Sequence, residues 1–120
     1  MNFQSSRTKG EEGEERAVQY LEQNGFSILA RNYSPKTNFQ GGEIDVIAKR
    51  GSRIHFIEVK FRRTDAYGAG RESVGAAKQK SIRRLASMWL VKNKLYGVAP
   101  ISFDVIEITA QKIEYLENCF

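Results

Sequence analysis

Residues 43–62, EIDVIAKRGSRIHFIEVKFR, contain two largely apolar segments separated by Gly51-Ser52. Successive side chains of a β-strand point to opposite faces of a sheet, and a glycine in the first position of a two-residue loop suits a tight hairpin turn. The stretch therefore predicts two antiparallel strands, residues 43–50 and 53–61, joined by that turn.

The hairpin register brings ionic side chains together on one face of the expected sheet. With the turn at residues 51–52, Asp45 lies opposite Glu58, and Lys60 follows on the same face. Directly opposed Cβ atoms are about 4.5–5.5 Å apart, and like charges in such positions destabilise the pair. Two carboxylates held that close need a shared proton or a cation, and a hard divalent ion such as Mg²⁺ takes oxygen ligands. The register therefore predicts a metal site.

A second interpretation of the same face stays open. Glu43 would lie opposite Lys60, so the two could form an ion pair on a solvated hairpin, with the other acids tolerated, because surface charges of this kind are common. His55, the single histidine, points to the opposite and mostly apolar face. We expect it to be a structural residue rather than a ligand.

The expected first helix carries a carboxylate toward the hairpin. Its inward stripe includes Ala17 and Leu21, and counting back at helical spacing reaches Glu14. The neighbouring Gly13 weakens a helix relative to alanine, which is a reason to expect close approach of the helix to another element. The alternative is that Glu14 is one of several solvated glutamates and that the stripe is shifted by one residue.

Periodicity and turn residues divide the whole chain into seven elements. An N-cap at Thr8, three residues before Glu11, opens the first helix, and Ser73 is the N-cap candidate of the second. The expected order is helix 9–24, strand 26–33, a turn-rich loop 34–42, the hairpin strands 43–50 and 53–61, a basic loop 62–72, helix 73–94, and strands 101–109 and 113–120. This order, α-β-β-β-α-β-β, predicts one α+β (α/β) domain over residues 1–120, with a mixed β-sheet flanked by helices.

The second helix has an apolar stripe that also contains a lysine. The stripe is formed by Val74, Ala77, Ile82, Leu85, Met88 and Trp89. Lys78 lies on it near the helix start, where it either snorkels past the edge of the core or contacts a phosphate at the rim of the site. Trp89 is expected in the core rather than stacked on a base. Asp104, in ISFDVIEI, is equally compatible with a further site carboxylate and with a structural role.

Composition and charge favour a polyanionic partner. Of the 120 residues, 19 are Lys or Arg and 14 are Asp or Glu, and the pI is about 9.5. Nucleic acid is expected before anionic lipid, because no basic amphipathic helix has an aromatic face, although many basic domains bind nothing anionic. The sequence has no apolar run that could span a membrane and no secretory signal, and its one cysteine, Cys119, fits a reducing cytoplasm. We therefore expect a cytoplasmic protein.

Six motifs in this order resemble a known family. They are GEEGEERAVQYL, GFSILARNY, GEIDVIA, FIEVKFR, VGAAKQKSIRRLA and FDVIEI, and together they cover most of the chain. The combination resembles the YraN-like family of small bacterial proteins thought to be endonucleases, within the PD-(D/E)XK superfamily. The resemblance implies a restriction-endonuclease-like fold. The chain departs from it at Ile44, where the superfamily name has proline, and in the loop 34–42, which is longer than the usual connection.

The resemblance also implies catalytic roles. Asp45, Glu58 and Lys60 match the superfamily triad, and Glu14 matches a helical carboxylate of its resolvase-like branch. The metal, Mg²⁺ or Mn²⁺, would be held by Asp45, Glu58, the carbonyl of Val59 and Glu14. Lys60 would orient the attacking water and stabilise charge in the transition state. The implied reaction is phosphodiester hydrolysis, on DNA in preference to RNA, including branched or damaged DNA.

Basic and polar residues after the hairpin are candidates for backbone contacts, which are salt-sensitive and independent of sequence. These residues are Arg62, Arg63, Arg71, Lys78, Gln79, Arg83 and Arg84. A homodimer is a further expectation, since enzymes that cut junctions often need two active sites. The rival hypothesis is a nucleic-acid-binding or assembly module that keeps the nuclease fold without catalysis. The presence of both acids and the lysine favours the enzyme.

Overall fold

The computed structural model describes the backbone of residues 5–36, 41–62 and 74–120, and the side chains of these residues from Gly13 onward. In this part of the chain the elements are α1 (Ser5–Gln23), β1 (Ser27–Tyr33), β2 (Ile44–Arg50), β3 (Arg53–Phe61), α2 (Ala76–Lys92), β4 (Ile101–Ile108) and β5 (Ile113–Leu116). The predicted order α-β-β-β-α-β-β and the α+β class are therefore confirmed. No described helix is long and apolar enough to cross a membrane.

The five strands form one mixed sheet in the order β1-β2-β3-β4-β5. Neighbouring strands are antiparallel except for β3 and β4, which run parallel and are connected through α2. Arg50 pairs with Arg53, so the predicted hairpin register is confirmed, and Gly51 takes the φ of 63° that the first turn position requires. The hairpin accordingly occupies the middle of the sheet.

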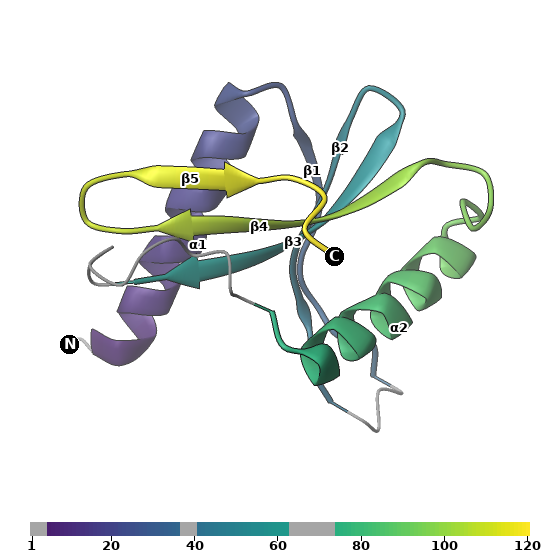
Figure 1. Cartoon of the computed structure of the whole chain (residues 1–120), viewed down its shortest axis with the longest axis horizontal. Coiled ribbons are helices and arrows are strands. Elements are labelled where there is room, and N and C mark those ends of the chain that lie inside the picture. Colours follow the sequence, from purple (N-terminus) through teal and green to yellow (C-terminus); the bar gives the residue numbers. More distant parts are fainter. Residues whose placement is uncertain (1–4, 37–40, 63–73) are drawn as a thin grey trace.

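The two helices cover opposite faces of the sheet (Figure 1). On one face α2 packs through Ile82, Leu85 and Trp89 against apolar residues of β2, β3 and β4. On the other, α1 packs through Ala17 and Leu21. The inward stripe predicted for the first helix and the core position predicted for Trp89 are thus confirmed. Of the second predicted stripe, Ala77 is exposed, and Val74 and Met88 are only half-buried.

Both predicted helix starts are wrong. Helix α1 already begins at Ser5, so Thr8 lies inside it, because no proline or glycine interrupts residues 5–9. Helix α2 begins later than expected, after Gly75 as its N-cap, and Ser73 lies outside the described residues. Gly75 is extended, with φ −66° and ψ 166°, and no side chain caps this helix end.

The last strand is shorter than the predicted 113–120. It ends at Leu116, where its pairing with Val105 of β4 stops. Asn118 then adopts a φ of 60°, and the Cys119 N–H donates to the Phe103 carbonyl at 2.7 Å. The chain end therefore folds back over β4 instead of continuing the sheet.

Candidate active site

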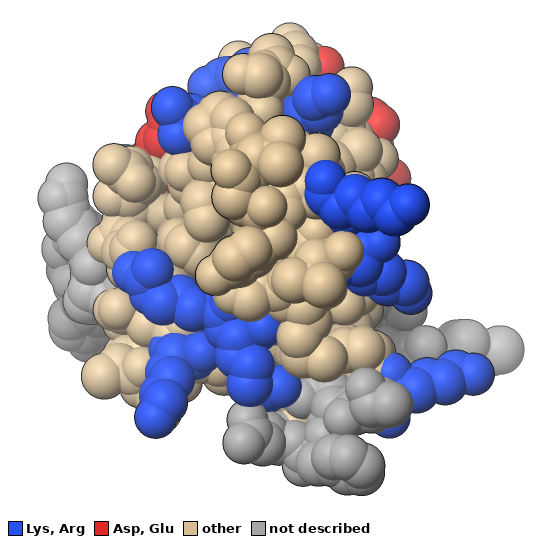
Figure 2. All heavy atoms as spheres, turned by 90° about the vertical axis from the view of Figure 1, so that its right-hand side faces the viewer, with Lys and Arg blue, Asp and Glu red and all other residues tan. Residues whose placement is uncertain are grey.

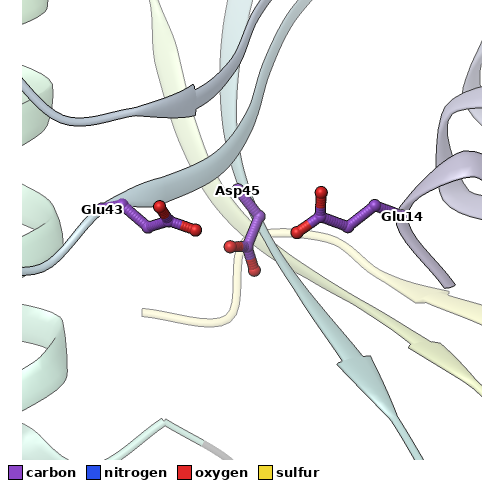
Figure 3. Close-up of side chains that lie close together, drawn as sticks. All are labelled: Glu14, Glu43 and Asp45. Atoms are coloured by element: carbon purple, nitrogen blue, oxygen red, sulfur yellow. The ribbon is translucent and has the colours of Figure 1, made fainter. Parts of the chain in front are cut away.

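Three carboxylates from separate elements converge beside the hairpin. Glu14 comes from α1, Glu43 from the segment just before β2, and Asp45 from β2 itself. One oxygen of each lies within 4.8 Å of the others, and Figure 3 shows the three side chains pointing toward one another. Oxygen donors in such a group match the preference of hard divalent cations. The structure thus brings Glu14 and Asp45, two of the predicted metal ligands, together.

Glu14 reaches this position because α1 packs very closely on β3. A Cβ added to Gly13 would lie 3.2 Å from Cδ1 of Phe61, which is tighter than ordinary van der Waals contact. A side chain at this position would require Phe61 or the helix to shift by a few tenths of an ångström. The predicted close approach of α1 to the hairpin at Gly13 is confirmed.

Asn32 and Glu43 belong to the cluster and were missed as site residues. The Asn32 amide donates to Glu14 Oε2 and to Glu43 Oε2, each at 3.1 Å. The backbone of Asn32 has a φ of 51°. The hairpin register predicts Glu43 as an ion-pair partner of Lys60 and gives it no role in metal binding. Side chains two apart on an extended chain share a face, so the sequence GEID already places Glu43 beside Asp45. Nothing local to Asn32 gave a comparable signal.

The paired part of the hairpin ends at Val46 and Ile57, one residue before Asp45 and Glu58, and the charge of Glu58 acts on Asp45. The backbone N–H of Val59 donates to Asp45 Oδ2 at 2.8 Å. Burial, the charge of Glu58 and, more weakly, those of Glu14 and Glu43 raise the pKa of Asp45 to about 8, although the Val59 hydrogen bond opposes the shift. A nearby cation would therefore be needed to keep the Asp45 carboxylate ionised below a pH of about 8.

Glu58 is buried and paired with a lysine of the other helix. Its carboxylate is only 6% exposed and lies 2.6 Å from Nζ of Lys78, whose own side chain is 55% exposed. The hydrogen bond to Glu58 raises the pKa of Lys78, and the charges of Asp45 and Glu43 add to the effect. Lys78, predicted as a phosphate contact at the site rim, thus lies on a carboxylate of the site.

Lys60 follows Glu58 on the α2 face of β3 and is half-buried. Its direct neighbour on β4 is Glu107, which is buried. Arg62 Nε lies 2.6 Å from Glu107 Oε2, close enough for an ion pair but without the alignment of a hydrogen bond. Lys60 therefore lies on the same face of β3 as Glu58, beside a buried glutamate of β4.

The other predicted phosphate contacts have intramolecular partners or lie outside the described residues. The Arg84 guanidinium donates to the Gly41 carbonyl at 3.0 Å, and Gln79 donates to the Val74 carbonyl at 2.8 Å. Arg83 lies over the Phe103 ring, 4.8 Å from its centroid. Arg63 and Arg71 are among the residues that the structure does not describe. Figure 2 nevertheless shows Lys and Arg side chains gathered over the lower half of the face that carries α2.

His55 and Asp104 form a separate buried network on the α1 side of the sheet. His55 Nδ1 lies 2.6 Å from Asp104 Oδ2, and since a carboxylate only accepts, the ring nitrogen donates. Asp104 also accepts from the hydroxyls of Ser102 and Tyr115 and from the Asn118 N–H. Burial, followed by the Asp104 hydrogen bond, raises the pKa of Tyr115, which keeps its hydroxyl protonated. This arrangement supports the structural readings of both residues.

Replacement of Asp45 should reveal the strain in the acidic cluster. Because the folded-state pKa is raised from 3.8 to about 8, the folded protein binds the extra proton between these values, and wild-type stability falls as pH rises through that window. Asp45→Asn removes the titration, so without metal it should be more stable than wild type above pH 8 by about 1–3 kcal/mol, discounted for partial solvation.

Urea unfolding at about pH 4 and about pH 8.5 would measure this difference, since the two proteins should differ little at the lower value. Glu22→Gln on the exposed side of α1 removes one carboxylate elsewhere and serves as the control. Equal stability of Asp45→Asn and wild type at the higher pH would contradict the assigned environment of Asp45.

Comparison with known proteins gives one consistent result. A family model described as "Uncharacterised protein family UPF0102" matches residues 13–108. A UPF0102 protein of Thermodesulfovibrio yellowstonii is similar to the chain, with 43% identity over 92% of this chain and 94% of its own length. A UPF0102 protein of Aliivibrio fischeri is 40% identical over 96% and 93%, respectively. Another from Yersinia enterocolitica is 38% identical over 97% of both chains.

Proposed function

This chain belongs to the UPF0102 family, which is the YraN family that its motifs resemble, and we propose that it is a metal-dependent nuclease hydrolysing phosphodiester bonds. The observation that supports the proposal is a group of four carboxylates whose charges act on one another at one end of the hairpin, with Lys60 two residues beyond Glu58 on the same face of β3. The four are Glu14, Glu43, Asp45 and Glu58. Carboxylates so arranged repel one another unless a cation or protons compensate their charge.

The donor set fits Mg²⁺ or Mn²⁺. Glu14, Glu43 and Asp45 offer one oxygen each within a sphere that one ion can fill, and Glu58 and the Val59 carbonyl are the further candidates. When bound, the ion would polarise a scissile phosphate and lower the pKa of a water molecule. The raised pKa of Asp45 supports this assignment, because a group disfavoured as an anion gains most from a nearby cation.

The chain's own residues supply positioning and charge. Asn32 orients the Glu14 and Glu43 carboxylates, and the Val59 N–H fixes Asp45. Lys60 would donate to the water or to a phosphate oxygen, where its ammonium stabilises negative charge that develops in the transition state. Basic residues on the α2 face would hold the nucleic-acid backbone. DNA is the proposed substrate, and a homodimer would supply a second site for branched forms.

Metal binding and cleavage together test the proposal. Calorimetric titration of wild type with Mn²⁺ should show binding, and Asp45→Asn should weaken it by about 100-fold or more, since even outer residues of metal sites contribute about 10–100-fold. Glu22→Gln removes one negative charge as Asp45→Asn does, but at an exposed position of α1 outside the acidic cluster. It should bind Mn²⁺ like wild type.

The same proteins would then be incubated with Mn²⁺ and a panel of duplex, flap and junction DNA and of RNA. Wild type should cleave at least one substrate, and Asp45→Asn none. Binding of metal and nucleic acid without any cleavage would favour the non-catalytic binding module. If wild type binds no divalent ion, the proposed nuclease chemistry is wrong.

A further inference from the structure

The ion pair between Lys78 and Glu58 joins an exposed, flexible lysine side chain to a buried glutamate. Glu58 lies on the central strand β3 and is nearly inaccessible, whereas the lysine side chain extends from the first turn of α2 and is more than half exposed. The flexible four-carbon stem of Lys78 can rotate its ammonium away from Glu58. The Glu58 side chain is buried on a strand and has little room to move with it. The ion pair can therefore separate through movement of the Lys78 side chain, whereas Glu58 stays in place.

A buried carboxylate needs a positive partner whenever it is ionised, because an unpaired buried charge is strongly destabilising. In the structure Nζ of Lys78 provides it, at 2.6 Å from Glu58 Oε2. The charges of Asp45 and Glu43 act on the same ammonium. Lys78 thus supplies positive charge to the carboxylates to which we assign the metal, and an ammonium and a divalent ion near one carboxylate repel each other.

We propose that Lys78 is a displaceable counter-ion: it neutralises Glu58 in the metal-free protein, leaves when a divalent cation binds, and then contacts a nucleic-acid phosphate. This inference rests on the proposed function. It goes further by making metal binding and nucleic-acid binding mutually reinforcing. By linkage, the cation should strengthen phosphate binding, and nucleic acid should strengthen cation binding, by the same factor.

The first test measures Mn²⁺ affinity by calorimetry in wild type, Lys78→Met and Lys80→Met. Lys80 lies on the same helix, is exposed, and changes the net charge equally when replaced. Lys78→Met should bind Mn²⁺ about five- to tenfold more tightly than wild type, because the competing charge is gone, while Lys80→Met should stay within about twofold. Circular dichroism would verify that all three proteins are folded.

The second test measures binding of a short duplex DNA with and without Mn²⁺, using Lys60→Ala throughout so that cleavage is too slow to disturb the measurement. Mn²⁺ should raise the affinity of Lys60→Ala about tenfold, and of Lys60→Ala with Lys78→Met by less than about twofold. Lys60→Ala with Lys80→Met should keep the full gain from Mn²⁺.

The outcomes separate this inference from the proposed function. If wild type binds Mn²⁺ but Lys78→Met binds it equally or more weakly, Lys78 is not a competing counter-ion, and the metal site stands. If Mn²⁺ raises DNA affinity equally with and without Lys78, the released ammonium does not reach a phosphate, and the proposed coupling is wrong. If wild type binds no Mn²⁺, the metal-dependent function fails, and this inference fails with it.

Discussion

Lys60→Ala should slow cleavage of a preferred DNA substrate by about two to three orders of magnitude, the usual loss when one donor to the transition state is removed. The carboxylates of Glu14, Glu43 and Asp45 stay in place in this variant, so Mn²⁺ binding should persist and tighten slightly as a nearby positive charge disappears. Folding should also persist, because Lys60 is only half-buried near the end of its strand.

Single-turnover kinetics with saturating Mn²⁺ would measure the chemical step directly. Lys60→Arg should not restore the rate, since a planar guanidinium does not replace a compact ammonium beside a bound water. Lys49→Ala is the matched control, because Lys49 lies on the neighbouring strand of the same hairpin near the turn and is exposed. A wild-type rate for Lys60→Ala would show that the cleaving site lies elsewhere or that the activity comes from a contaminant.

Asp104→Ala should destabilise the fold by about 3–5 kcal/mol, because each buried donor that loses its acceptor costs about 1–3 kcal/mol. The carboxylate is fully buried, and the substitution would leave His55 and the hydroxyls of Ser102 and Tyr115 without their common acceptor. It would also release the Asn118 N–H and with it the chain end that folds back over β4.

Urea unfolding is the measurement. A loss of this size is a large part of a stability of about 5–15 kcal/mol, so Asp104→Asn, which preserves shape, serves as the milder second variant. Tyr115→Phe and Ser102→Ala each remove a single donor and should lose about 0.5–1.5 kcal/mol. Glu22→Ala, at an exposed position, should lose little. If Asp104→Ala and Asp104→Asn both unfold at the wild-type urea concentration, the network does not stabilise the fold.

The sequence alone determined the central hairpin and which of its side chains should lie on the same face. Alternation of side chains and a turn glycine are local properties, so they predicted the register that the structure shows from Val46 opposite Ile57 to Arg50 opposite Arg53. Helical periodicity likewise predicted that Glu14 would face the hairpin above Ala17 and Leu21. Helix starts were predicted less well, because a capping signal such as that of Thr8 is weak where the residues before it also tolerate a helix.

Only the tertiary structure decided which partners these residues meet. Lys78 lies on Glu58, and Asn32 lies between Glu14 and Glu43, because packing fixes α1 and α2 on opposite faces of the sheet at particular heights. Periodicity indicates which face of a helix is buried, but not how far the helix slides along its neighbour. Contacts between residues distant in sequence depend on that placement. The sequence therefore predicted the site residues on the strands, but not the contacts that the helix residues make with them.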